Sequence, residues 1–241
     1  MTTPKFLFLP GTLCDSRVFD ELTAQLVSVD CDISLIDYQM AADLPSMAVQ
    51  VEKQANGQEV ILIAFSMGGM VAFECIRRAN IEISGLVLLA SNANADGEGK
   101  ADIRAQHLRM AREQGLGTLI NNIYMPQYLY RQAPEHQTLI LNMAESLGLD
   151  VFSAQLQVLA KRPAAYSELS RFLAPLLIIG GQEDPLCPPS EQAKMHASNP
   201  NSSKVILPNV GHFVTLEAAK EVSDKIVLWL TQHFHRSIHE G

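Results

Sequence analysis

The chain has 241 residues, of which 47% are apolar and 18% charged, and its formal net charge is −8. This composition is typical of a globular protein and excludes the disordered and fibrous classes. The acidic balance, without a cluster of basic residues, argues against a nucleic-acid partner.

Six short runs rich in Val, Ile, Leu and Phe predict β-strands. They cover residues 5–9, 33–36, 60–64, 86–90, 176–179 and 205–207. Most of these runs do not alternate with polar residues, which indicates strands that are buried on both faces. Such strands are typical of a parallel sheet that is covered by helices.

Segments with apolar residues three and four positions apart predict helices between these runs. They cover residues 15–28, 46–54, 68–79, 189–197 and 215–233. The alternation of strand and helix predicts an α/β fold, in which a doubly wound, mainly parallel sheet of about six strands has right-handed crossovers.

Residues 92–171 interrupt this alternation, because they contain amphipathic helical patterns and no strand-like run. The helical pieces cover 102–115, 119–125, 134–147 and 151–160, with Gly117, Pro126, Gly148 and Pro163 as breaks. We expect a helical cap inserted between two parts of a core domain, residues 1–91 and 172–241. It would lie over the sheet edge where open α/β folds bind ligands. A helical excursion without contact to a site is the alternative.

The strand predicted over 60–64 leads directly into Ser66, which precedes a predicted helix. The residues two positions before and after it, Ala64 and Gly68, are small, as a sharp strand-to-helix turn requires. This context is typical of a nucleophile elbow, which exposes the serine at a helix N-terminus where negative charge is favoured. Ser146 has the same small neighbours, but it follows a helical pattern, so a turn or helix end is its preferred interpretation.

A serine hydroxyl needs a base to remove its proton and a third group to hold that base. Asp184 follows the strand predicted over 176–179, and His212 follows the strand predicted over 205–207. Taken alone, Asp184 fits a turn and His212 fits a helix cap or a buried hydrogen-bonding histidine. Together with Ser66 they follow three different strands in the chain order Ser, Asp, His, which predicts a catalytic triad.

The strand over 5–9 ends in the tight turn Pro10-Gly11-Thr12. This turn is able to aim the N–H of Thr12 at the elbow, where it would bind an oxyanion together with the N–H of Met67. One such pre-aimed donor typically stabilises a transition state by about 3 to 4 kcal/mol. A simple strand-to-helix turn fits the same residues if the triad is absent.

With these motifs the sequence resembles the α/β-hydrolase superfamily, in particular its compact bacterial esterases, enol-lactonases and cofactor-free perhydrolases. The resemblance covers nearly the whole chain, from Pro10-Gly11 to Gly211-His212 and the following Leu216-Glu217. It implies Ser66 as nucleophile, His212 as general base and then acid, and Asp184 as the group that orients His212.

Three positions depart from the common pattern of this superfamily. Pro10 stands where many members have His, Ala64 replaces the first Gly of the elbow, and Ala219 occupies a common Pro position. Only Ala64 touches the chemistry, and its methyl group is small enough to be tolerated.

The predicted function is that of a serine hydrolase that cleaves a small carboxylic ester, thioester or lactone through an acyl-enzyme, with no metal or organic cofactor. Acyl transfer, perhydrolysis and C–C bond hydrolysis use the same triad, and a catalytically silent ligand receptor is an alternative of another class. The candidate substrate-binding residues are Leu13, Phe65, Tyr124, Met125, Leu156 and Phe213.

The cysteines Cys14, Cys31, Cys75 and Cys187 are scattered, without a CxxC pair or a Cys/His cluster at metal-ligand spacing. We expect reduced thiols. The apolar runs are far shorter than the roughly 20 residues that cross a bilayer, and the first residues lack the pattern of a secretory signal. We therefore expect a cytoplasmic monomer or homodimer that acts on a small acyl substrate, without nucleic-acid or membrane partners.

Overall fold

The structure is a computed structural model of the chain, and it describes residues 5–26, 29 and 31–234. The remaining residues of the predicted core domain lie outside the described residues, as do two residues of the helix predicted over 15–28.

One parallel sheet of six strands forms the centre of the fold, in the order β2-β1-β3-β4-β5-β6. The strands are β1 (Lys5–Leu9), β2 (Asp32–Leu35), β3 (Val60–Phe65), β4 (Ile83–Leu89), β5 (Leu176–Gly181) and β6 (Ser203–Leu207). Each of them overlaps a predicted run, which confirms the predicted sheet. β3 lies inside the sheet and is buried at every residue, as its unbroken apolar sequence predicts.

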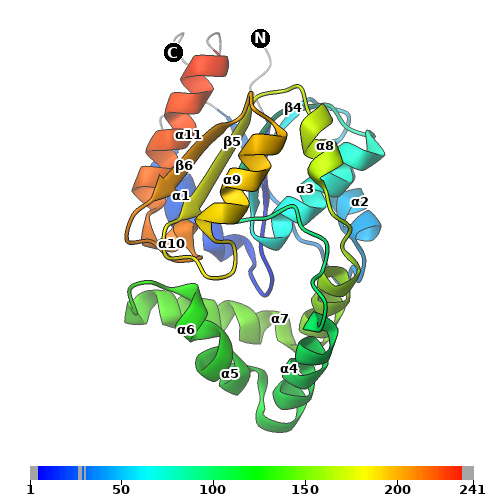
Figure 1. Cartoon of the computed structure of the whole chain (residues 1–241), viewed down its shortest axis with the longest axis vertical. Helices are drawn as coiled ribbons and strands as arrows, with labels where there is room; N and C mark the ends of the chain where they lie inside the picture. The colour runs from blue at the N-terminus through cyan, green and yellow to red at the C-terminus, as the bar shows by residue number, and fades with distance from the viewer. Residues whose placement is uncertain (1–4, 27–28, 30, 235–241) are drawn as a thin grey trace.

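Helices cover both faces of this sheet (Figure 1). Successive strand residues point to opposite faces, so Phe6 and Phe8 belong to one hydrophobic cluster, whereas Leu7 and Leu9 belong to another. The first cluster includes residues of η1 (Ser16–Phe19), α1 (Asp20–Gln25), α10 (Val214–Glu217) and α11 (Ala219–His233). The second includes residues of α2 (Leu44–Ala55), α3 (Met67–Arg78), α8 (Tyr166–Arg171) and α9 (Pro189–Ser198).

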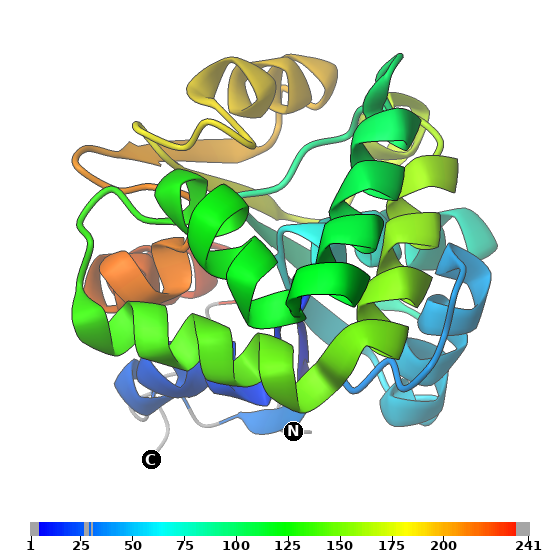
Figure 2. The same cartoon turned by 90° about the horizontal axis from the view of Figure 1, so that it is seen from below.

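A separate layer of helices lies beyond the carboxyl ends of the strands (Figures 1 and 2). It consists of α4 (Lys100–Gln114), α5 (Leu116–Leu119), the π-helical turn η2 (Ile120–Tyr124), α6 (Met125–Tyr128) and α7 (Pro134–Lys161), and we call it the helical layer. α8 was not predicted as a helix; it packs against α3 and α9, beside the sheet.

The long helix α7 bends at Gly148, where φ is 79° and ψ is 179°. This combination is accessible to glycine and costly for other residues. The break predicted at Gly148 is therefore confirmed, and it lets the two halves of α7 run in different directions around the helical layer (Figure 2). Over the described residues, no helix combines the length and the apolar character needed to cross a membrane.

Candidate active site

Ser66 lies in a sharp turn between β3 and α3, with φ at 52° and ψ at −114°. A positive φ is uncommon for a residue other than glycine and indicates a conformation that the surroundings must hold. A Cβ atom at Gly68 would lie 2.1 Å from the carbonyl oxygen of Leu9, so only glycine lets the turn approach β1 this closely. The Ser91 hydroxyl donates a hydrogen bond of 2.8 Å to the Ser66 carbonyl, and this bond helps to hold the turn.

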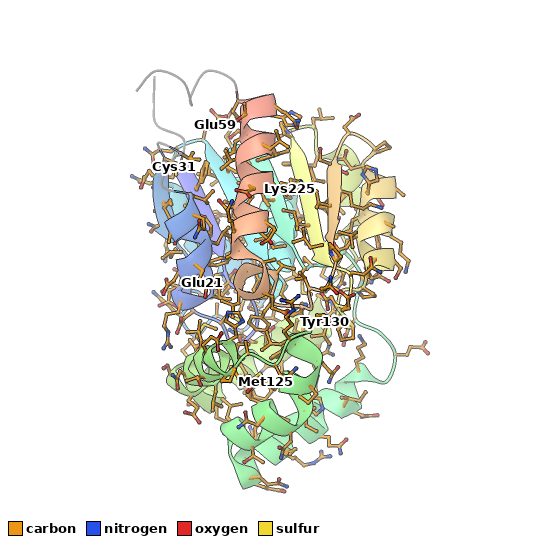
Figure 3. The ribbon with its side chains drawn as sticks, turned by 90° about the vertical axis from the view of Figure 1, so that its left-hand side faces the viewer. Glu21, Cys31, Glu59, Met125, Tyr130 and Lys225 are labelled. Atoms are coloured by element: carbon orange, nitrogen blue, oxygen red, sulfur yellow. The ribbon has the colours of Figure 1, made fainter. Side chains whose placement is uncertain are left out.

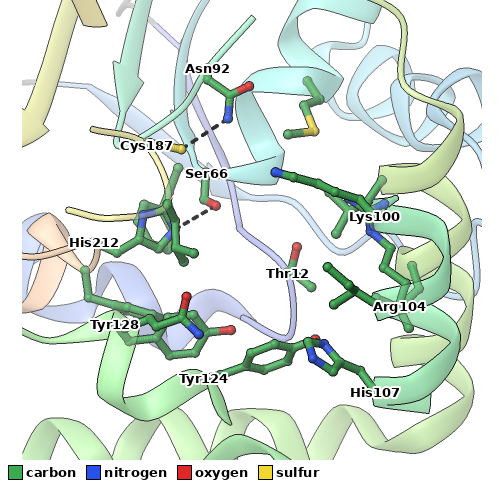
Figure 4. Close-up of a pocket in the computed structure, with 18 residues that line it drawn as sticks. Thr12, Ser66, Asn92, Lys100, Arg104, His107, Tyr124, Tyr128, Cys187 and His212 are labelled. Carbon is green, nitrogen blue, oxygen red and sulfur yellow. Dashed lines mark hydrogen bonds between the residues drawn. The ribbon is translucent and has the colours of Figure 1, made fainter. Parts of the chain in front are cut away.

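A chain of two hydrogen-bonding contacts joins three side chains at this turn. The Nε2 atom of His212 lies 2.9 Å from the Oγ atom of Ser66 (Figure 4), and its Nδ1 atom lies 2.8 Å from Oδ2 of Asp184. Only 3% of His212 and 2% of Asp184 is exposed to solvent. The structure thus brings the predicted serine, histidine and acid together at the carboxyl edge of the sheet.

The second carboxylate oxygen of Asp184 accepts hydrogen bonds from the N–H groups of Leu186 at 2.8 Å and Cys187 at 3.0 Å. Burial by itself would raise the pKa of Asp184, but the electrostatic attraction of the His212 ring and the hydrogen bonds to Asp184 together lower it below its ordinary value. Asp184 is therefore ionised at neutral pH. It accepts the Nδ1–H of His212, which leaves the Nε2 lone pair facing the Ser66 hydroxyl.

The predicted oxyanion donors are the backbone N–H groups of Met67, which directly follows Ser66, and of Thr12, which lines the same cavity as Ser66. Met67 is the first residue of α3, and neither N–H donates a hydrogen bond to another described residue. The next N–H after Thr12, that of Leu13, donates to Oε1 of Gln155 at 2.8 Å. Gln155 belongs to α7, so the helical layer holds the loop that carries Thr12.

A cavity of about 280 Å³ opens in front of Ser66, between the strand ends and the helical layer (Figure 4). Four of the six predicted substrate-binding residues line it, namely Phe65, Tyr124, Leu156 and Phe213.

Leu13 and Met125 do not line this cavity. Both are buried in the hydrophobic core, with 3% and 4% of their surface exposed, and Met125 lies inside the helical layer (Figure 3). An apolar residue on a helix fits a core position and a pocket wall equally well, so the sequence does not separate the two.

Several cavity residues had no recognisable signal in the sequence. The ring of Tyr128 stacks on the ring of His212, with centroids 6.1 Å apart. The backbone carbonyl of Tyr128 accepts a hydrogen bond of 2.9 Å from the backbone N–H of His212. Burial raises the pKa of Tyr128 well above its ordinary value, so its hydroxyl stays protonated. Asn92, Lys100 and Arg104 also line the cavity.

Glu217 was noted in the sequence only as part of the family resemblance, and the structure gives it a definite position. Its Oε1 atom accepts the N–H of Gly211 at 2.9 Å, and its Oε2 atom accepts the N–H groups of Tyr130 at 2.8 Å and Arg131 at 3.1 Å. One carboxylate therefore ties the loop that carries His212 to the segment between α6 and α7.

The second serine with small neighbours, Ser146, lies within α7. Its hydroxyl donates to the carbonyl of Asn142 at 2.7 Å and accepts from Arg17 at 3.1 Å. A hydroxyl engaged in this way, with no histidine among these partners, lacks the base that a nucleophile needs.

Asp184, Cys187 and His212 each bring a potential metal ligand atom to within 4.8 Å of the others. However, the Asp184 oxygens already accept three hydrogen bonds, one of them from His212. Burial, followed by the charge of Asp184, raises the pKa of Cys187 to about 12, which keeps its thiol protonated. These donors fit the hydrogen-bonded chain better than they fit a metal ion, because a cysteine ligand must be a thiolate.

Comparison with known proteins gives a consistent result. A model of the alpha/beta hydrolase family matches residues 6–225. Over 180 residues, or 71% of the chain, the sequence is 28% identical to the dihydrolipoyllysine-residue acetyltransferase component of an acetoin cleaving system from Pseudomonas putida, and it spans 45% of that protein's length.

Solved structures share the fold at low sequence identity. A thermophilic esterase from Thermogutta terrifontis superimposes with a TM-score of 0.85 at 24% identity, covering 96% of this chain and 91% of the other. MenH from S. aureus gives 0.85 at 20% identity, with 97% and 96% covered. The enol-lactonase from Burkholderia xenovorans gives 0.83 at 14% identity, with 96% and 92% covered.

Proposed function

Because the chain belongs to the alpha/beta hydrolase family, we propose that it is a serine hydrolase that cleaves a small carboxylic ester, thioester or lactone through an acyl-enzyme on Ser66. The observation that carries the proposal is the chain of contacts from Ser66 Oγ to His212 Nε2, at 2.9 Å, and from His212 Nδ1 to Asp184, at 2.8 Å. This is the arrangement of a nucleophile, a base and the group that orients the base.

In the proposed reaction, the Oγ atom of Ser66 attacks the carbonyl carbon of the substrate while His212 Nε2 takes the hydroxyl proton. The carbonyl oxygen becomes an oxyanion, which the free N–H groups of Thr12 and Met67 stabilise. The tetrahedral intermediate collapses, the bond to the leaving group breaks, and His212 gives its proton to that group. A water molecule, deprotonated by His212, then attacks the acyl carbon and releases the acid and Ser66.

The helical layer limits the size of the cavity, which supports the proposal of a small substrate. It closes one side of the cavity of about 280 Å³ in front of Ser66, a volume near the lower limit for small-molecule sites. We propose that the layer acts as a cap that limits the length of the acyl group. Esterase and enol-lactonase neighbours share this fold.

The test combines active-site labelling with turnover. We expect a fluorophosphonate probe to form an adduct on Ser66, located by peptide mass spectrometry. Ser66→Ala should lower kcat for short-chain 4-nitrophenyl esters by several orders of magnitude, as loss of the nucleophile costs a serine protease about a million-fold.

Ser146→Ala is the matched control, because Ser146 has similar small neighbours but lies within a helix. It should keep both labelling and turnover. Adduct formation on Ser146, or unchanged turnover by Ser66→Ala, would refute the proposal. Tight ligand binding without product formation would instead indicate the receptor alternative.

Acyl transfer is a second candidate, and the acetyltransferase component from Pseudomonas putida is the observation that favours it. In that reaction a thiol, not water, attacks the acyl carbon on Ser66, so that a thioester forms and Ser66 is released. Adding dihydrolipoamide to the ester assay separates the two functions. A thioester product and a rate that rises with thiol concentration indicate transfer, whereas free acid alone indicates hydrolysis.

A further inference from the structure

The wall of the cavity in front of Ser66 carries positive charge. Of the described residues that line it, Lys100 and Arg104 are cationic, and none is Asp or Glu. The whole chain has a formal net charge of −8. A cationic cavity in an acidic protein is therefore a local feature that the overall composition does not explain.

Both cations come from the same side of α4. They are four residues apart, so they lie one above the other on the helix. Figure 4 shows the side chain of Lys100 extending from α4 into the cavity, toward the side that carries Ser66, with Arg104 behind it. Lys100 forms no ion pair with a described residue, which leaves its ammonium group available to a ligand.

The charge of Arg104 is only partly balanced. Asp96 accepts hydrogen bonds from Arg104, one of them at 2.7 Å, but it also faces Arg162 at 3.5 Å. Burial by itself would raise the pKa of Asp96. The hydrogen bond and the positive charge of Arg104 lower this pKa, and the charges of Arg162 and Lys100 lower it further, so Asp96 is ionised. Of these four groups only Lys100 and Arg104 line the cavity, and Asp96, which is shared between two arginines, does not neutralise them all, so the wall keeps a net positive charge.

We propose that Lys100, supported by Arg104, binds a carboxylate of the substrate, so that the preferred substrates are small acyl compounds that carry a second, anionic group. Hemiesters and lactones of short dicarboxylic acids have this chemistry. The inference rests on the proposed function of Ser66. It goes beyond it, because the triad accepts neutral and anionic esters alike.

The rest of the cavity suits such a molecule. Phe65, Leu156, Leu159 and Phe213 give the wall an apolar surface, which matches the short carbon chain between a carboxylate and an acyl carbon. A charge-assisted contact to an ammonium group typically improves binding by roughly ten- to hundredfold.

The test compares two esters of equal shape. 4-Nitrophenyl hemiglutarate carries a carboxylate where 4-nitrophenyl 5-methylhexanoate carries an isopropyl group. We expect the wild type to prefer the hemiglutarate in kcat/KM after subtraction of the Ser66→Ala background. Lys100→Met should lower the ratio of the two kcat/KM values by roughly ten- to hundredfold.

Lys225→Met is the matched control, because it removes the same charge from an exposed site on α11, away from the helical layer (Figure 3). It should leave the ratio at the wild-type value. A second pair of substrates, 3-carboxy-4-nitrophenyl acetate and 4-nitrophenyl acetate, carries the charge on the leaving group. A preference for the anionic ester in the first pair alone places the anion on the acyl side of the substrate, and a preference in the second pair alone places it on the alcohol side.

Two results would overturn the inference: a ratio near one in both pairs for the wild type, or a ratio that Lys100→Met changes no more than Lys225→Met does. Failure of the proposed function would give a different result, because the wild type would then turn over neither ester faster than the Ser66→Ala background. In that case calorimetry tests the anion site directly, by measuring the binding of glutarate to Ser66→Ala with and without the additional substitution Lys100→Met. Binding that Lys100→Met weakens at least tenfold supports the anion site, and absence of binding refutes it.

Discussion

Asp184 is the most buried of the three residues of the proposed triad. Its two oxygens accept hydrogen bonds from the His212 ring and from two backbone N–H groups, and 2% of the residue is exposed. An ionised carboxylate tolerates such burial only because each of these donors stabilises the negative charge. The pKa of Asp184 is accordingly below its ordinary value, in spite of the burial that opposes this.

We expect Asp184→Asn to lower kcat by about four orders of magnitude, since an amide no longer selects the reactive form of the histidine. It should also lower the free energy of unfolding at pH 7 by about 2 kcal/mol. Because the folded pKa is lowered, the stabilisation by Asp184 is complete above the ordinary aspartate pKa of about 3.9 and is lost as the pH falls through the folded value.

Urea unfolding of wild type and variant from pH 7 down to pH 3 checks this linkage. The difference between their free energies of unfolding should shrink toward acid. A difference that stays constant or grows would show that Asp184 is not held ionised in the folded state.

Helix α7 positions a loop that lies far from it in the sequence. Its Gln155 is 3% exposed and accepts the N–H of Leu13 at 2.8 Å. Leu13 has a φ of 54°, which is unfavourable for a leucine, so its peptide needs external support. That peptide directly follows Thr12, the proposed oxyanion donor.

We expect Gln155→Leu to leave the buried Leu13 N–H without an acceptor, which costs about 1 to 3 kcal/mol of unfolding free energy. The kcat for esters should fall because the Thr12 N–H loses its position, whereas KM should change less. Thermal unfolding and steady-state kinetics check this expectation.

Gln157→Leu, at an exposed position of the same helix, is the control and should leave both quantities near the wild-type values. Equal kinetic effects of the two substitutions would mean that Gln155 does not position the loop.

Hydrogen bonds join the helical layer and the sheet at the candidate active site. Glu217 of α10 binds backbone N–H groups on both sides, at Gly211 and at Tyr130 and Arg131. The backbone N–H of His212 donates a hydrogen bond to the backbone carbonyl of Tyr128, the last residue of α6. The position of His212 therefore depends on how the helical layer is seated.

We expect Glu217→Ala to free all three N–H groups and to speed amide hydrogen exchange roughly tenfold or more at Gly211, His212, Tyr130 and Arg131 together. Exchange measured by mass spectrometry, alongside kcat, checks this coupling. Glu221→Ala, at an exposed position of α11, is the control. Faster exchange at Gly211 with Tyr130 and Arg131 still protected would show that the two layers move independently.

The strands and the strand-to-helix turn at Ser66 were predictable from the sequence, because their signals are local. An unbroken apolar run such as residues 60–65 indicates a buried parallel strand, and small residues around a serine indicate a tight turn. The positions of Asp184 and His212 followed from one further rule, that the carboxyl ends of parallel strands meet at one edge.

Which helical residues face the cavity depends on how the helices pack in three dimensions. Leu156 and Met125 have the same apolar character and belong to the same hydrophobic cluster, yet only Leu156 also lines the cavity. The hydrogen bonds of Gln155 to Leu13 and of Glu217 to Tyr130 cross long stretches of sequence. The charge of the cavity wall depends on the contact of Arg104 with Asp96, which lies outside the lining. The sequence gives the identity of each residue and indicates its local conformation. The lining of the cavity and the contacts of Gln155, Glu217 and Asp96 arise only when distant segments pack together.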